Sequence, residues 1–107
     1  MRPRNYITAE MIEGRNKWLV RVSEVTGVAV DDIMGHRRDE NVSTARQLVM
    51  WALCELCGYS HTQVGVLMRR DHSTVTYGVN HVRWGYNAKK VDKLKEQLKY
   101  LQDGERH

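Results

Sequence analysis

The chain has 107 residues, of which 41% are hydrophobic, and 17 basic residues against 13 acidic ones give a formal net charge of +4. This length suits one domain, and this composition argues against a disordered chain. The sequence contains no run of 18 apolar residues and no apolar leader, so we expect no membrane partner and a cytoplasmic location. The basic excess is compatible with a polyanionic partner.

Helical periodicity begins near the N-terminus, and Gly27 is placed to end this first helix. Its apolar stripe consists of Ile7, Met11, Trp18, Val22 and Val25. A short helix is expected around residues 30–35, because Asp31 and Asp32 suit the positive end of a helix dipole. The six polar residues 36–41 predict a loop.

The clearest predicted helix lies in the middle of the chain, from about residue 43 until Gly58 stops it. Its apolar residues follow the spacing of a buried central helix, and they are Ala45, Leu48, Val49, Ala52, Leu53 and Leu56. Ser60 and Gln63 have capping-box spacing, which predicts a new helix over about 60–69. Asp71 is a natural N-cap for the next helix. The buried stripe of that helix is Val75, Val79, Val82 and Tyr86.

The last predicted helix covers about residues 88–103. Its apolar side carries Val91, Leu94, Leu98 and Leu101. Their heptad-like spacing covers under two repeats, so we expect the helix to pack back on the domain, with a dimer seam as the alternative. Trp84 and Tyr86 are expected to anchor it. Six helical segments without an alternating strand pattern predict an all-α single domain over residues 1–107, with a core at about 17–86.

Two of these helices, near 60–69 and 72–86, are joined by a turn of about three residues, which is the layout of a helix-turn-helix. Close helix contacts are expected at Gly65 and Gly78. The outward face of the second helix is expected to expose His72, Ser73, Thr76, Tyr77 and Asn80. Such groups, together with an aspartate, can read base edges. Similar helix pairs also occur in α-domains that bind no DNA.

Four segments carry a family resemblance: VAVDDIMGHRR, ARQLVMWALCEL, YSHTQVGVLM and RRDHSTV. From about Lys17 to Arg83 the chain resembles the C-terminal DNA-binding domain of the bacterial replication initiator DnaA, which belongs to the Trp-repressor-like helix-turn-helix group. The resemblance implies that fold with an extra C-terminal helix, and sequence-specific binding to double-stranded DNA without a cofactor. The chain has no G-x-x-x-x-G-K-[ST] loop, so we expect no bound nucleotide and no ATPase activity in it.

The resemblance also assigns the candidate DNA-binding residues. Those expected in the major groove are Arg70, Asp71, His72, Ser73 and Thr74. The basic loop residues Arg37 and Arg38 would reach towards the minor groove. The pair Arg46 and Gln47 would contact the DNA backbone, and Arg69 is placed to reach a further phosphate.

Several residues depart from the family's pattern. Met68 and Arg69 stand where glycines are usual, which predicts an altered turn, and Ser73 replaces a common threonine. The loop continues with Asp39 and Glu40, and residues 31–46 carry three positive and four negative side chains. These charges predict weaker attraction to DNA. They also leave open a protein-interaction module of a mobile element or phage that retains the fold with weak or no DNA binding.

The cysteines and histidines of the sequence indicate neither a metal site nor a catalytic site. Cys54 and Cys57 lack the second ligand pair that a structural zinc site needs, so no metal is expected. No nucleophile–base pair follows from the spacing of the histidines, so we expect no enzyme; His81 and His107 are expected to be solvated. The N-terminal MRPRN is expected to be a frayed end, with a minor-groove arm as the alternative. The start at Met1 favours a free-standing protein over a fragment.

Overall fold

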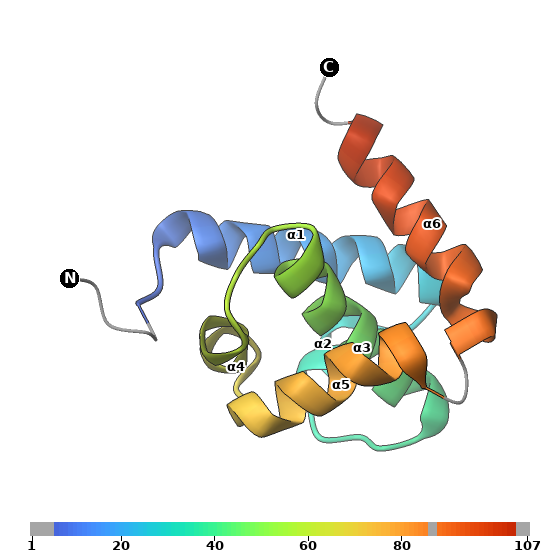
Figure 1. Cartoon of the computed structure of the whole chain (residues 1–107), viewed down its shortest axis with the longest axis horizontal. Helices are drawn as coiled ribbons and strands as arrows, with labels where there is room; N and C mark the ends of the chain where they lie inside the picture. The colour runs from blue at the N-terminus through green and yellow to red at the C-terminus, as the bar shows by residue number, and fades with distance from the viewer. Residues whose placement is uncertain (1–5, 86–87, 105–107) are drawn as a thin grey trace.

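The computed structural model describes residues 6–85 and 88–104, and in these ranges it contains six α-helices and no strand, which confirms the predicted all-α class. The helices are α1 (Ala9–Thr26), α2 (Val30–Met34), α3 (Glu40–Glu55), α4 (His61–Met68), α5 (His72–Trp84) and α6 (Ala88–Gly104). Figure 1 shows α1 across the top of the body, α5 below it, α4 end-on at the left and α6 rising at the right. No helix in the described ranges has both the length and the apolar character needed to cross a bilayer.

Helix α3 forms the centre of the fold, as its periodicity predicts. Its buried apolar side chains are Val42, Ala45, Leu48, Val49, Met50, Trp51, Ala52 and Leu53. The helix starts at Glu40, about three residues earlier than predicted, so the loop is confined to residues 36–39. The extended backbone of Asp39 ends the loop, and Glu40 suits the first turn because a carboxylate there interacts favourably with the helix dipole.

Local sequence signals set most helix ends. The Thr8 hydroxyl accepts a hydrogen bond from the Met11 amide at 3.1 Å, and Gly27 ends α1 in the left-handed conformation. Ser60 and Gln63 form the predicted capping box, in which each side chain bonds the other residue's backbone. Helix α4 ends at Met68, slightly before the predicted limit, because the next residue leaves the helical region.

Two glycines permit the close approach expected of them. A Cβ on Gly65 would lie 2.6 Å from the backbone oxygen of Arg70, so this glycine lets the turn fold tightly against α4. A Cβ on Gly78 would lie 2.6 Å from Cε of Met50, so Gly78 fits α5 onto α3 rather than onto α4. Helix α5 is therefore packed closely on the central helix α3.

Helix α6 packs back on the domain, as expected. Val91 and Leu98 are buried, and Nε2 of Gln102 donates to the Leu56 oxygen at 2.8 Å. The expectation that Trp84 anchors this helix is wrong, because 81% of that side chain is exposed. Lys95 and Lys99 instead lie over the ring of buried Trp51. Tyr86, the other expected anchor, lies outside the described residues.

Candidate nucleic-acid interface

The first turn of α5 presents a row of exposed polar groups. Asp71, His72, Ser73 and Thr74 are all exposed, because the buried side of the helix starts only at Val75. That buried side continues through Gly78, Val79 and Val82, and the predicted fourth member, Tyr86, is outside the described residues. Four of the five predicted major-groove residues thus lie together at one end of the helix, whereas the fifth, Arg70, is partly buried and bonds backbone oxygens.

Asp71 occupies the N-cap position of α5 but does not cap it through its side chain. Its backbone is extended (φ −60°, ψ 146°), and its oxygen accepts from the Val75 amide at 3.1 Å, as at an ordinary N-cap. The carboxylate makes no capping hydrogen bond. The expectation of a conventional aspartate cap is therefore correct in position only, and the carboxylate remains available to a partner.

Thr76 is less available than the sequence suggests. Its hydroxyl donates to the His72 oxygen at 3.0 Å and lies 2.7 Å from Nδ1 of His61 on α4. It therefore ties α5 to α4, and its side chain is only partly exposed. The exposed polar face is carried instead by the first turn, together with Tyr77 and Asn80.

A hollow of about 450 Å³ lies where the loop after α2 meets α3 and α5. Five of the ten predicted DNA-binding residues line it: Arg38, Arg46, Gln47, Arg70 and Thr74. Its other lining residues are His36, Ser43, Met50 and Tyr77. Among the described residues this lining includes three arginines and no carboxylate, so its electrostatic character suits an anion.

Arg46 is a buried brace of the loop as well as a wall of this hollow. Only 9% of it is exposed. Its Nε donates to the Ile33 oxygen at 2.8 Å, and Nη2 lies 2.9–3.2 Å from the oxygens of Asp32, Gly35 and Arg37. Burial is the main cause that lowers its pKa, and the nearby Arg70 charge adds to this. Within the described part of the chain, Nη1 makes no hydrogen bond and is the donor left for a ligand.

Arg70, in the turn between α4 and α5, braces the same loop. Its guanidinium donates to the Met68 oxygen at 2.9 Å, and it also bonds the Gly35 oxygen, which Arg46 shares. Burial lowers its pKa below that of a free arginine. Two guanidinium groups thus converge on one carbonyl beside a hollow whose lining has no carboxylate.

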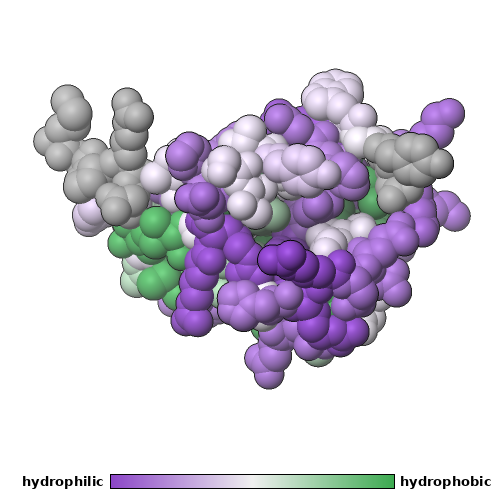
Figure 2. Space-filling model, turned by 90° about the horizontal axis from the view of Figure 1, so that it is seen from below, coloured by the Kyte–Doolittle hydropathy of each residue, from purple (hydrophilic) through white to green (hydrophobic). Residues whose placement is uncertain are grey.

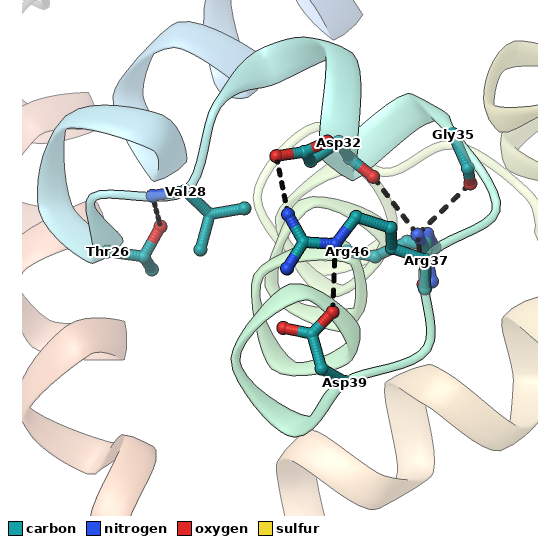
Figure 3. Close-up of polar contacts among 7 residues, drawn as sticks. All are labelled: Thr26, Val28, Asp32, Gly35, Arg37, Asp39 and Arg46. Atoms are coloured by element: carbon teal, nitrogen blue, oxygen red, sulfur yellow. Dashed lines mark hydrogen bonds and ion pairs between the residues drawn. The ribbon is translucent and has the colours of Figure 1, made fainter.

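Arg37, the predicted minor-groove residue, is held by two carboxylates (Figure 3). Its Nη1 lies 3.1 Å from Oδ2 of Asp32, and its Nε lies 3.1 Å from Oδ1 of Asp39. The side chain is still 59% exposed, so the pairs are solvated. Arg37 must leave both carboxylates before it can enter a groove, whereas Arg38 beside it is exposed and lines the hollow.

Arg69 adopts the left-handed conformation, with φ 58° and ψ 44°. This is the conformation that a glycine would take at little cost, so the turn keeps a glycine-type geometry although the sequence predicts an altered one. The side chain is exposed and forms no ion pair or hydrogen bond with the residues that the structure describes. Its cation is therefore free beside the first turn of α5.

The face that carries α5 and the α2–α3 loop is predominantly hydrophilic. These segments lie at the bottom of Figure 1, and Figure 2 views the molecule from that side. Hydrophilic side chains cover most of this face, and the largest hydrophobic area lies at its left edge. A charged, hydrated surface can approach this face without covering a large apolar patch.

Sequence reasoning did not place His36, Ser43, Met50 or Tyr77 beside the hollow, and it missed the contact between His81 and Gln47. Nδ1 of His81 lies 2.9 Å from Oε1 of Gln47, and the Tyr77 ring stacks on the imidazole at 5.7 Å between centroids. The expectation that His81 is solvated is therefore wrong; His107 lies outside the described residues. The signal was available, because His81 is three residues after Gly78 and so lies on the side of α5 that turns towards α3.

The two cysteines are free and partly buried. Burial raises the pKa of the Cys54 thiol to about 11, and it raises the pKa of Cys57 as well. Both thiols are protonated at neutral pH, and a protonated thiol is a poor nucleophile and a poor metal ligand. In the described ranges no group of three or more histidine, cysteine or acidic residues is arranged to hold a metal ion.

Comparison with known proteins adds independent information. The family described as "Bacterial dnaA protein helix-turn-helix" matches residues 19–82, more than half of the chain. The chain is similar to the chromosomal replication initiator protein DnaA of Picosynechococcus sp., with 30% identity over 79% of the chain and 19% of that protein. It is also similar to the DnaA of Leifsonia xyli subsp. xyli (38% identity over 55% of the chain and 13% of that protein). For Clavibacter sepedonicus DnaA the identity is 43% over 47% of the chain and 11% of that protein.

The chain spans less than a fifth of the length of the curated relatives it matches. No solved structure gives a significant match to it. The relatedness therefore concerns the helix-turn-helix segment and not the remaining four fifths of those proteins.

Proposed function

The chain belongs to the bacterial DnaA helix-turn-helix family, and from this premise we propose that it binds double-stranded DNA sequence-specifically, with the first turn of α5 in the major groove. In this proposal Asp71, His72 and Ser73 reach base edges. No cofactor and no nucleotide takes part. The location would be the cytoplasm, and the process would be replication initiation or its regulation.

One observation carries this proposal: the hollow with three arginines and no carboxylate lies between the two segments that would enter neighbouring grooves. A duplex backbone separates each major groove from the adjacent minor groove. If α5 enters one groove and the loop at Arg37 and Arg38 reaches the other, the intervening strand passes over this hollow. A phosphate there would find Nη1 of Arg46 and the Gln47 amide.

The contacts then divide into two kinds. Phosphate contacts from Arg38, Arg46, Gln47 and Arg69 set the register of the protein on the duplex but carry no sequence information. Arg70, which the resemblance assigns to the major groove, bonds the Met68 and Gly35 oxygens and in this proposal holds the turn in place. The first-turn side chains discriminate between bases, and an exposed uncapped Asp71 carboxylate is suited to accept from a cytosine amino group.

The ion pairs of Arg37 favour one second candidate, a protein-interaction module that retains the fold. Because Asp32 and Asp39 neutralise the loop arginine, this part of the face attracts phosphate less than a free arginine would. Such a module would use the same exposed first turn to contact a protein and would have little affinity for duplexes of any sequence.

The test is a selection of bound duplexes from a random pool, followed by fluorescence anisotropy at about 50 mM and about 200 mM salt. We expect the wild type to prefer selected over random duplexes by at least about 1,000-fold. Asp71→Ala should reduce this preference by about 1–3 kcal/mol without changing the salt dependence. Failure to enrich any sequence, with no binding at the lower salt, would favour the interaction module.

A further inference from the structure

We propose that His81 is a positioning residue, which holds the Gln47 amide so that its NH₂ group faces the phosphate hollow. The inference rests on the proposed DNA binding and adds a residue to it. The Gln47 oxygen lies 2.9 Å from Nδ1 of His81. A neutral imidazole that carries its proton on Nδ1 donates to that oxygen. The two N–H groups of the Gln47 amide nitrogen are then left for the hollow, which Gln47 lines.

The rest of the Gln47 side chain has little freedom. A Cβ on Gly78 would lie 3.2 Å from Cγ of Gln47, so the stem packs closely on the α5 backbone. The His81 ring is itself held, because Tyr77 stacks on it with an angle of 16° between the planes. The main freedom left to the glutamine is a flip of its amide, which exchanges the oxygen and the nitrogen.

The charges around the hollow alone would favour the amide orientation that does not suit phosphate, with the Gln47 oxygen facing the hollow. The three arginines around the hollow attract the amide oxygen towards themselves. An oxygen facing the hollow would repel an incoming phosphate, whereas the NH₂ group would donate to it. The Nδ1–H of His81 opposes this preference because it provides a donor on the opposite side, so the amide is set before the ligand arrives.

Substitutions at position 81 distinguish the hydrogen-bond donor of His81 from the volume of its ring. Asn places its amide nitrogen two bonds from Cβ, as histidine places Nδ1, so His81→Asn retains the donor. His81→Gln places its nitrogen one bond further out, and His81→Phe keeps a ring for Tyr77 but has no donor. We expect the affinity for duplexes to depend on this donor. His81→Asn should bind within about twofold of wild type, and His81→Phe should bind about 3–10-fold more weakly, as for the loss of one hydrogen bond.

The binding experiment is a double-mutant cycle with Gln47→Ala, measured by anisotropy on selected and random duplexes at several salt concentrations. His81→Phe should weaken both duplexes alike and leave the salt slope unchanged, because Gln47 is neutral and releases no counterion. In the Gln47→Ala background it should have no further effect. A full effect in that background, or a loss in His81→Asn equal to that in His81→Phe, would overturn the inference.

A second readout does not need DNA. Long-range ¹H–¹⁵N spectra of the free protein report which imidazole nitrogen carries the proton. We expect Nδ1–H, together with a shift of the Gln47 side-chain amide signals in His81→Phe. If the wild type bound no duplex, the proposed function would fail while this measurement still decides the inference, since an Nε2–H tautomer would contradict it.

Discussion

Release of Arg37 from its two carboxylates should strengthen DNA binding. In the double variant Asp32→Asn with Asp39→Asn, both 3.1 Å ion pairs are lost while the side-chain shapes are nearly kept. The three side chains are between 38% and 59% exposed, so each pair is a surface ion pair worth about 0.2–1 kcal/mol. Arg37 would then reach a phosphate or a minor groove at a cost lower by about 0.4–2 kcal/mol, which corresponds to about 2–30-fold in affinity.

The assay is anisotropy with a selected duplex over a series of salt concentrations. We expect tighter binding at low salt and a slope of log K against log salt that is steeper by about one, because one more cation now displaces counterions. Asp31→Asn is the control for the Asp32 half of the double variant, since it removes one negative charge from the same helix at an exposed residue that makes no ion pair with Arg37. The reasoning is refuted if Asp31→Asn gives the same gain, or if Arg37→Ala in the double variant does not remove it.

Further substitutions test the roles of single groups. Arg46→Ala should lower the free energy of unfolding by about 3 kcal/mol in urea denaturation, because one buried and three partly buried carbonyl oxygens lose their donor; a stability loss below about 1 kcal/mol would contradict the bracing role. Arg69→Gly should raise the thermal midpoint, since it relieves about 1 kcal/mol of left-handed strain, yet weaken binding to every duplex alike; weaker binding to one sequence only would argue against a phosphate contact. The raised pKa of Cys54 predicts alkylation by iodoacetamide at pH 8 that is slower than for a free thiol and accelerates as the pH approaches 11, whereas a fast reaction at pH 7 would disagree.

The helices could be predicted from the sequence because their signals are local. The Ser60 and Gln63 capping box and the apolar spacing of the central helix each lie within a few turns of one helix, and the structure confirms both. The three-residue turn before α5 follows from the same kind of signal. Sequence alone therefore located the exposed first turn that starts at Asp71.

The remainder of the site depends on contacts that no local pattern contains. Arg70 bonds an oxygen 35 residues earlier, and His81 bonds a side chain 34 residues earlier. The resemblance assigns Arg46 to the DNA backbone, but it does not indicate that the loop closes over this side chain and makes the guanidinium a buried donor. The family resemblance named Arg46 and Gln47, but it gave no reason to expect His81.

The shared Gly35 carbonyl limits how this domain can be re-engineered. Arg46 from the central helix and Arg70 from the turn meet on that one oxygen, so the loop and the turn cannot shift independently. A chimera that takes only helix α5 from a relative would gain the first-turn side chains proposed to contact bases, but it would not preserve the contacts of Arg46 and Arg70 with the Gly35 oxygen. Chimeras should exchange residues 35–38 together with residues 69–74, and they should keep Arg46 in the recipient scaffold.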